Sequence, residues 1–182
     1  MDDTTQTEGP IVLVRPEQEP MYPVVFEVLE KAFGRPDEAQ LVEKLRQTEN
    51  FDPRLSLVAL RDGVVVGHVL FYPVTVEMPD GTATHAMGLG PVGVLPAHQN
   101  IGIGEALIWQ GLEICRKEKE YRVIVVGHPT YYPRFGFKRA STFGLKCAYD
   151  VPDDAFMACE LKSGAWDGIT GVAKYHPFFD GV

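Results

Sequence analysis

The sequence has few cysteines, with three among its 182 residues, and none of them forms a C-x-x-C pair. Cys115, Cys147 and Cys159 are widely spaced, and an odd number of cysteines is a poor basis for a disulfide framework. Free thiols are typical of proteins in reducing compartments. We therefore predict a cytoplasmic protein with free thiols and no bound metal.

Positive charge is also scarce, because 17 Lys and Arg residues stand against 25 Asp and Glu residues, a formal net charge of −8. General electrostatic binding to nucleic acid or to an acidic membrane requires a basic surface. We therefore predict no nucleic-acid partner. An anionic small ligand is still compatible with this charge, because it requires only a local positive field.

Long apolar runs are absent as well. No segment approaches the roughly 20 apolar residues of a membrane span. The first ten residues, MDDTTQTEGP, are acidic and polar, unlike a signal peptide. We predict no membrane partner, and we expect these ten residues to be a disordered lead.

The chain does have the composition of a folded domain, with 45% apolar and 23% charged residues. Its length fits one domain of ordinary size, and we find no internal repeat. We therefore predict one domain over residues 11–182, after the lead of residues 1–10.

The first half of the chain has the patterns of two helices and a β-meander. Asp37 and Gln40 have the spacing of a capping box at the start of the second helix. Asp62-Gly63 and Asp80-Gly81 are turn signals between β-rich segments. The patterns predict a strand over 11–14, helices over 21–33 and 38–47, and strands over 55–60, 64–71 with an extension over 74–78, and 82–94.

The second half has a long amphipathic segment followed by a fully apolar one. Apolar residues recur on one face of residues 102–118, with Gly111 on that face allowing close approach to a sheet. Residues 122–126 are continuously apolar, as in a strand covered on both faces. A strand, a crossover helix and a strand indicate a parallel pair. Weaker strands are predicted over 136–138, 144–148 and 156–161, so the fold class is α+β with a mixed sheet.

Two glycine clusters are candidates for a phosphate-binding loop. Gly88, Gly90 and Gly93 spell G-x-G-x-x-G, but Val94-Leu95-Pro96 follows them instead of the helix that a dinucleotide site requires. We expect these glycines to lie in a bulged or splayed strand. In residues 99–104, the pattern Q-x-x-G-x-G opens the long helix, whose first N–H groups have no internal partners. Spacing alone leaves open whether those glycines bind a diphosphate or only allow tight packing.

The segment VGVLPAHQNIGIGEAL, residues 92–107, resembles motif A of the GCN5-related N-acetyltransferase (GNAT) superfamily. A second segment, GHPTYYPRFGF over residues 127–137, resembles the Y-x-x-x-G-F segment of that family, and FMACEL near the C-terminus resembles endings in one bacterial branch. The resemblance implies a single acyltransferase domain. Its expected fold is a mostly antiparallel twisted sheet flanked by helices, with a splayed central pair of parallel strands.

The resemblance also implies a binding site for acetyl-CoA (coenzyme A) as co-substrate. The backbone N–H groups of the helix-opening loop would hold the diphosphate, and the end of the long strand would pair with the pantetheine arm. Gly90-Pro91 is where a bulge that starts the splay is expected. The implied cofactor-binding residues are Val92, Gly93, Val94, Gln99, Asn100, Ile101, Gly102, Ile103 and Gly104.

The implied reaction is direct attack of a primary amine on the thioester. The Val94 N–H is the candidate donor to the developing oxyanion. Tyr132 matches the general-acid tyrosine of the family and would protonate the leaving thiolate, and we favour it over its neighbour Tyr131. Pro133 restricts Tyr132 away from helical geometry, so we expect a distorted turn here.

The general base has no clear signature in the sequence. His85 on the long strand, His128 after the apolar strand and Glu77 near a hairpin turn all remain open, whereas we interpret His68 and His176 as structural. A local group of basic residues around 116–139 is read mainly as solvated charge, with some members available to the adenosine phosphates.

The acceptor is expected to be a small-molecule or peptide amine, and a homodimer is an additional expectation. The aromatic segment 166–182 would either line the acceptor pocket or pack as a tail or dimer contact, and we favour the latter. The alternative to an enzyme is a non-catalytic acyl-CoA-binding module of the same fold. A dinucleotide-dependent oxidoreductase is the third reading.

Overall fold

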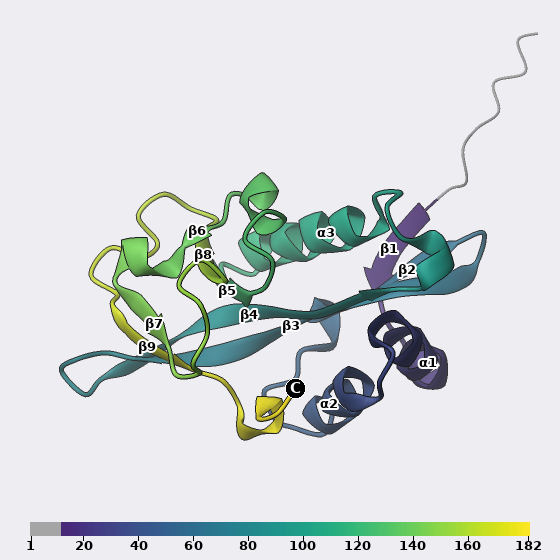
Figure 1. Cartoon of the computed structure of the whole chain (residues 1–182), viewed down its shortest axis with the longest axis horizontal. Helices are drawn as coiled ribbons and strands as arrows, with labels where there is room; N and C mark the ends of the chain where they lie inside the picture. The colour runs from purple at the N-terminus through teal and green to yellow at the C-terminus, as the bar shows by residue number, and fades with distance from the viewer. Residues whose placement is uncertain (1–11) are drawn as a thin grey trace, which may run out of the picture.

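The computed structural model describes residues 12–182 and shows one mixed sheet covered on both faces. The predicted lead of residues 1–10, and the first residue of the predicted strand, lie outside the described residues. Figure 1 shows α3 (Ile103–Lys117) on one face of the sheet and α1 (Tyr22–Phe33) with α2 (Asp37–Leu45) on the other. The C-terminal end of the chain also lies on the α2 side.

The sheet holds nine strands within the described residues, and seven of them follow the order β1-β2-β3-β4-β5-β8-β6. The parallel β7–β9 pair joins β3 through β9. Every neighbouring pair is antiparallel except β4–β5 and β7–β9. The strands are β1 (Val12–Pro16), β2 (Ser56–Arg61), β3 (Val64–Glu77), β4 (Ala83–Val94), β5 (Arg122–Val126), β6 (Lys138–Arg139), β7 (Leu145–Cys147), β8 (Phe156–Glu160) and β9 (Gly171–Lys174).

These elements confirm the predicted meander, the long helix and the parallel crossover. The expected capping box is wrong, because Asp37 is already the first residue of α2 and Pro36 occupies the N-cap position without a side-chain cap. Strand β9 has no counterpart in the prediction. The predicted strand over 136–138 is also displaced, because Gly136 ends a 3-10 turn at φ 91° and β6 begins only at Lys138.

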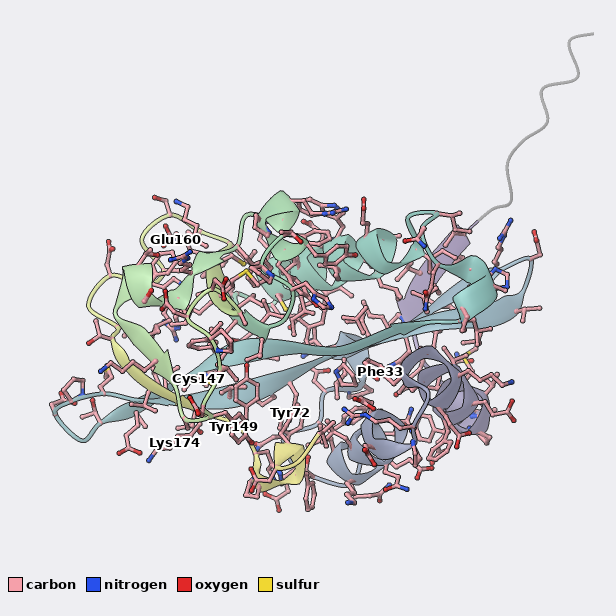
Figure 2. All side chains as sticks on the ribbon, viewed as in Figure 1. Phe33, Tyr72, Cys147, Tyr149, Glu160 and Lys174 are labelled. Carbon is pink, nitrogen blue, oxygen red and sulfur yellow. The ribbon has the colours of Figure 1, made fainter. Side chains whose placement is uncertain are left out.

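Apolar packing makes three core clusters, and two of them form layers under the helices on the two faces of the sheet. One layer lies under α3, where Phe71 of β3 occupies the space that a Cβ on Gly111 would need, which confirms the predicted close approach. The other layer lies under α1 and α2, where Tyr72 is 1% exposed (Figure 2). The sheet is therefore anchored from both sides, and its strands can separate locally without exposing the whole core.

The parallel strands β4 and β5 separate soon after they meet. Their pairing consists of Met87↔Val123 and Gly88↔Ile124. Beyond that point β5 stays with β8, while β4 stays with β3 as far as Gly67↔Val94. The predicted splayed central pair is confirmed, and it leaves a gap between the two strands.

A bulge in β4 lies where the separation begins. Val69 faces Val92 and Phe71 faces Leu89, so Gly90 and Pro91 together oppose the single residue between Val69 and Phe71. Two residues opposite one bend the strand and increase its twist. The expectation of a bulge at Gly90-Pro91 is confirmed, and the G-x-G-x-x-G glycines lie within a strand as predicted.

A buried polar network connects α2 to the sheet on the face opposite α3. The Arg46 guanidinium donates to both oxygens of Glu17, at 2.9 and 2.7 Å. The Ser56 hydroxyl donates to Glu17 at 2.6 Å and lies 2.9 Å from Nε2 of His68. His68 is fully buried, in keeping with the structural role predicted for it.

Candidate functional site

The N-terminus of α3 presents backbone N–H groups to open space. Gly102 is the N-cap at φ 87°, and no side chain caps the helix. Asn100 also has a positive φ of 61°, which turns the loop sharply before the helix. The first N–H groups of a helix have no intrahelical acceptor, and the helix dipole places partial positive charge there. This is a binding geometry for an anion, provided by backbone rather than by lysines.

The end of β4 presents a second row of backbone groups. Leu95 N–H donates to the Val66 carbonyl at 2.9 Å, which makes these two residues a hydrogen-bonded pair of the antiparallel ladder. Such pairs alternate along a ladder with pairs that make no such bonds. By this alternation Gly93 bonds to β3, whereas the N–H and C=O groups of Val92 and Val94 point away from β3, toward the gap.

The loop between β4 and α3 is tied to the end of the strand. The Gln99 side-chain amide donates to the Val94 carbonyl at 3.0 Å. This bond occupies the carbonyl of Val94 and leaves its N–H as the group that faces the gap. Ile101 points outward, with 55% of its surface exposed, and Ile103 is buried at 2%. The buried Ile103 therefore offers the site its backbone rather than an open side chain.

The first of two cavities, which we name the α3-side cavity, has a volume of about 700 Å³. The sequence predicted most of its lining, whereas Ile101 and Gly93 do not belong to it. Its lining residues are Val92, Val94, His98, Gln99, Asn100, Gly102, Ile103, Gly104, Glu105, His128, Tyr131, Tyr132 and Arg134.

Arg134 is the only Lys or Arg side chain in this lining, and it is part of a small polar cluster. It donates to Glu105 Oε1 at 2.6 Å and to the Tyr131 carbonyl at 2.9 Å. Its guanidinium also lies 4.4 Å from the centre of the Tyr131 ring. Other members of the local basic group pair elsewhere: Arg116 pairs with Glu113, and Arg139 pairs with Asp153.

Tyr131 and Tyr132 both line the α3-side cavity but lie at different depths. The Tyr131 hydroxyl lies 3.2 Å from the position that a Cβ on Gly104 would occupy, so it sits over the start of α3. Tyr132 begins a 3-10 turn over Tyr132–Phe135, which agrees with the distortion expected from Pro133. Its ring packs against Gly127 and Phe137, and burial raises the pKa of its hydroxyl to about 12.

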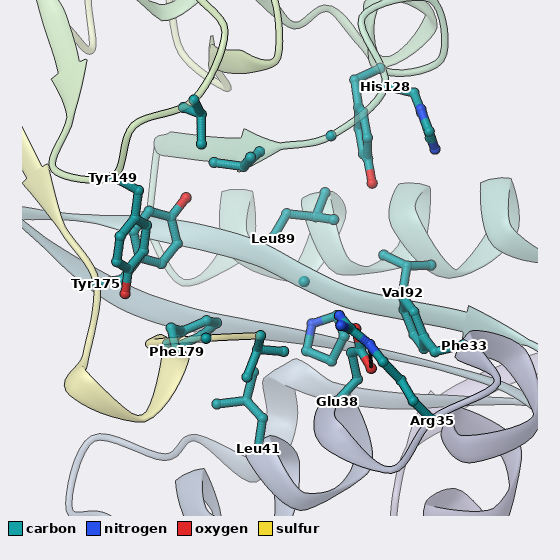
Figure 3. A pocket seen from close by; sticks show the side chains of 18 residues that line it. Phe33, Arg35, Glu38, Leu41, Leu89, Val92, His128, Tyr149, Tyr175 and Phe179 are labelled. Atoms are coloured by element: carbon teal, nitrogen blue, oxygen red, sulfur yellow. Dashed lines mark hydrogen bonds and ion pairs between the residues drawn. The ribbon is translucent and has the colours of Figure 1, made fainter.

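The second cavity, which we name the α2-side cavity, has a volume of about 530 Å³ (Figure 3). It is bounded by the end of α1 and the start of α2, the bulge of β4, the end of β5, and the C-terminal segment. Figure 3 shows Tyr149, Tyr175 and Phe179 grouped at one side of it and His128 at the other. Four lining residues from α1, α2 and the loop between them carry no sequence motif and were not predicted individually. They are Phe33, Arg35, Glu38 and Leu41.

The C-terminal segment has two kinds of aromatic residue. Trp166 is buried and donates to the Cys159 carbonyl at 3.1 Å, in agreement with the favoured interpretation of a packing tail. Tyr175 and Phe179 instead line the α2-side cavity. The segment therefore packs as a tail at Trp166 and lines a cavity at Tyr175 and Phe179. His176 accepts a hydrogen bond from the Phe178 N–H at 3.1 Å, consistent with its structural assignment.

The two cavities lie on opposite faces of the sheet and meet at three residues. Val92, His128 and Tyr132 line both of them. The meeting point is the gap between β4 and β5, where the Val92 and Val94 backbone groups are turned outward. A ligand in each cavity would therefore approach the other at this junction.

The three candidate bases are separated by the structure. His85 bonds to Glu120 at 2.8 Å beside a different hollow, and Glu77 pairs with Lys174. Neither lines the two cavities. His128 lines both, and among the side-chain hydrogen bonds of the described residues none involves its ring.

The comparisons with known proteins identify the family. A family model described as an acetyltransferase (GNAT) domain matches residues 14–140. A curated relative named "Uncharacterized N-acetyltransferase YhbS", from Escherichia coli strain K12, is 32% identical over 170 residues, which cover 93% of this chain and 99% of the relative. The chain belongs to the GNAT acetyltransferase family.

Two solved structures resemble the whole chain and contain a coenzyme. YhbS from Escherichia coli, in complex with CoA, has a TM-score of 0.86 at 31% identity and covers 94% of this chain and 93% of its own. A GNAT family acetyltransferase from Brucella melitensis, in complex with acetyl-CoA, has a TM-score of 0.76 at 32% identity. The match covers 94% of this chain and 100% of the Brucella melitensis chain. The predicted fold class is confirmed.

The described residues contain neither a membrane-spanning helix nor a group of metal-binding side chains. Within residues 12–182, no helix combines the length and the apolar character needed to cross a bilayer. In the same residues, no three His, Cys, Asp or Glu side chains are grouped so that they could hold a metal ion. Cys115, Cys147 and Cys159 are all free thiols.

Proposed function

We propose that the protein is an acetyl-CoA-dependent N-acetyltransferase that transfers the acetyl group directly to a primary amine. The observation that carries this proposal is the junction of the two cavities at Val92, His128 and Tyr132. One cavity has anion-binding geometry at a helix N-terminus, and the other is mostly apolar. An acyl donor and an amine can therefore be bound from opposite faces of the sheet and meet in the gap.

The residues fit the co-substrate by their backbone chemistry. The open N–H groups at the start of α3, over residues 102–105, would hold the diphosphate. Gly104 keeps this surface free, because a Cβ there would lie 3.2 Å from the Tyr131 hydroxyl. The outward N–H and C=O groups of Val92 would pair with the amide groups of the pantetheine arm, and the Val94 N–H stays available to the thioester. When bound, acetyl-CoA supplies a thioester carbonyl as the electrophile.

Three residues are assigned to the chemistry. The Val94 N–H donates to the carbonyl oxygen as negative charge develops on it. The Tyr132 hydroxyl acts as general acid toward the departing sulfur. With a pKa raised to about 12 by burial, it is fully protonated near neutral pH and is a standing hydrogen-bond donor. Transfer of its proton is less favourable than from a free phenol, so the hydrogen bond itself supplies much of the stabilisation.

His128 is assigned as the general base. An alkylammonium with a pKa of about 10.4 must lose a proton before it can attack. Of the three candidates, only His128 lies at the junction. An imidazole nitrogen there would take the proton as the amine attacks the carbonyl carbon.

The test measures thiol release from acetyl-CoA in the presence and absence of a panel of primary amines, with the product identified by mass spectrometry. We expect amine-dependent thiol release and a product one acetyl group heavier than the amine. If acetyl-CoA raises the melting temperature at micromolar concentration but no amine is acetylated, the non-catalytic binding module replaces this proposal. Absence of any stabilisation by acetyl-CoA would remove both.

We also infer a small-molecule or peptide amine as the acceptor and the cytoplasm as the location. The mostly apolar α2-side cavity supports the first inference and the three free thiols support the second. A homodimer remains a prediction, which a mass measurement in solution by light scattering tests.

A further inference from the structure

We propose that the acceptor is a primary amine carried on one aromatic or alkyl body, rather than a polyamine, an amino sugar or an anionic amine. This inference rests on the proposed function and names its substrate class. It follows from the chemistry of the α2-side cavity, which reaches the junction at one end and is closed by aromatic rings at the other (Figure 3).

The Arg and Glu side chains of this cavity neutralise each other. Among the described residues that line it, Arg35 and Glu38 are the only ones with an Asp, Glu, Lys or Arg side chain. The Arg35 Nε lies 3.1 Å from both carboxylate oxygens of Glu38, which is 5% exposed. A second ammonium or an anionic group on the acceptor would therefore find no unpaired Asp, Glu, Lys or Arg side chain in this lining, and burying such a group unpaired is costly.

The wall farthest from His128 offers flat apolar faces. Tyr149 and Tyr175 stack with ring centres 5.7 Å apart and planes 28° apart, and Phe179 lies edge-on to Tyr175 at 5.3 Å. The Tyr149 hydroxyl donates to Asp180 at 2.8 Å, so this side chain offers the cavity its ring rather than a free donor. Aromatic faces of this kind bind rings and alkyl chains by offset and edge contacts.

Leu89 and Val92 of β4 form the side of the cavity between this wall and the junction. A body that lies along them extends from the aromatic wall toward His128 and Tyr132. The volume of about 530 Å³ is in the range of small-ligand sites and admits a body of one or two rings. The amine then points to the junction, and the apolar body fills the cavity behind it.

The first experiment is a homologous series from n-propylamine to n-hexylamine, with 2-phenylethylamine, ethanolamine, glucosamine and spermidine added. Burial of one methylene changes kcat/KM by about fourfold. We expect kcat/KM to rise by about that factor per methylene, and 2-phenylethylamine to exceed ethanolamine by at least about a hundredfold. A flat series, or a preference for spermidine or glucosamine, would overturn the proposal.

The same series of amines distinguishes a wrong acceptor class from a wrong enzymatic function. Binding of each amine to the protein saturated with CoA is measured by calorimetry, without any reaction. If no amine is acetylated but affinity rises with chain length, the acceptor class stands and the enzymatic function fails. If all amines are acetylated at one rate and bind without preference, the function stands and the acceptor class fails.

Neighbouring phenylalanines provide a matched pair of variants. Phe179 lines the cavity, whereas Phe178 does not and is 39% exposed. Phe179→Ala is expected to lower kcat/KM for 2-phenylethylamine by at least about tenfold and to leave the Kd of acetyl-CoA unchanged. Phe178→Ala should leave both values unchanged. Equal effects of the two substitutions would contradict the assigned wall.

A second variant is designed to gain a preference for diamines. A gain of this kind cannot be caused by a loss of stability. Val151 lines the cavity on a loop at the edge of a core cluster and is partly exposed, so a carboxylate placed there keeps access to water. Val151→Asp is expected to raise the kcat/KM of cadaverine relative to n-pentylamine by about tenfold, because the second ammonium gains a partner. An unchanged ratio would show that the cavity does not hold the amine's body.

Discussion

At the scale of single residues, two adjacent tyrosines are equivalent in sequence but not in position. Tyr132 lines both cavities, whereas Tyr131 lines only the α3-side cavity and carries its hydroxyl over Gly104. Only a hydroxyl at the junction can approach the sulfur of a thioester that is reached from both sides. The assignment of the proton donor to Tyr132 therefore depends on position rather than on acidity, because burial makes this hydroxyl the weaker acid.

Tyr132→Phe removes the proposed donor and keeps the ring that packs against Phe137. We expect kcat to fall by about a hundredfold, with the Kd of acetyl-CoA within about twofold of wild type. Tyr131→Phe is the matched control and should lower kcat by less than about threefold. Steady-state thiol release and calorimetry give the two quantities. A larger kcat effect at Tyr131 would reverse the assignment.

His128→Ala tests the base through the pH dependence of the reaction. Without a residue to take the proton, only amine that is already deprotonated can attack. We expect kcat/KM at pH 7 to fall by about a hundredfold and to recover as pH rises toward the amine pKa of about 10.4. The initial rate of thiol release from pH 6 to 10 measures this. His85→Ala, at a residue outside both cavities, should leave the profile unchanged.

The buried His68 predicts a pH dependence of stability. Burial lowers its pKa to about 4 in the folded protein, against about 6.5 for an exposed histidine. The unfolded chain therefore binds more protons between these values, so the free energy of unfolding falls as pH falls from 6.5 to 4. We expect a loss of about 3 kcal/mol at most from this group, measured by urea unfolding at several pH values.

Glu17 belongs to the same network, and its effect on the free energy of unfolding falls in a different pH range from that of His68. Hydrogen bonds from Arg46 and Ser56 and the nearby His68 outweigh its desolvation by burial and lower its pKa, so its contribution is lost below its ordinary value of about 4.5. The range from 4.5 to 6.5 therefore reports on His68. His68→Gln should flatten the stability profile in that range, and an unchanged slope would show that His68 is not the group responsible.

At the scale of elements, the start of α3 and the end of β4 form one unit for the proposed binding of acetyl-CoA. The Gln99 amide on the Val94 carbonyl fixes the strand end relative to the loop, and Gly102 at φ 87° turns the loop into the helix. The geometry needs no lysine, which reconciles a net charge of −8 with an anionic ligand. Gly104 is the position where a side chain would interfere most directly.

Gly104→Val tests this unit. The new side chain would meet the Tyr131 hydroxyl and project into the α3-side cavity, while helical φ and ψ remain accessible to valine. We expect the affinity for acetyl-CoA to fall by at least about a hundredfold, with the melting temperature of the free protein within about 4 °C of wild type. Gln110→Val, on the exposed face of α3, is the control for helix propensity and should leave binding unchanged.

The elements that could be predicted from the sequence are those built by local interactions. The meander is specified by turns such as Asp62-Gly63, and α3 by an apolar face with Gly111 on it. Strand β9 could not be predicted, because its four residues, Gly171–Lys174, are strands only through pairing with β3 and β7. The capping box at Asp37 failed because Glu38 bonds to Arg35 and the helix begins at Asp37.

The same distinction applies to the site. The α3-side loop was predicted because its residues are consecutive, from Gln99 to Gly104. For the α2-side cavity, the first two helices and the C-terminal segment could be named as elements, but not the individual residues, because the cavity unites the start of α2, the β4 bulge, the end of β5 and the C-terminal segment. A single sequence carries no signal for contacts of this range, and only the fold brings Glu38 and Phe179 to one cavity.

At the scale of the whole molecule, the sheet separates the two cavities except at one gap. Each cavity is lined mainly from its own face of the sheet, so a ligand in one would leave the other accessible. The described lining residues include no cysteine, serine or lysine, and Glu38 is paired with Arg35. Glu105 is likewise paired with Arg134. His128 and Tyr132 at the junction are the proposed base and acid, so direct transfer to the amine requires no further residue to carry the acetyl group.

This arrangement predicts a ternary complex and a sequential reaction. Double-reciprocal plots of initial rate should intersect when acetyl-CoA and amine are varied together, and CoA should inhibit competitively against acetyl-CoA but not against the amine. Incubation with acetyl-CoA alone should leave the protein mass unchanged, because acetyl transfer requires the amine in the α2-side cavity. Parallel plots together with an acetylated protein would instead indicate a covalent intermediate, and peptide mapping would then locate the acetylated residue. The two measurements thus decide between direct and two-step transfer without depending on which amine is the natural acceptor.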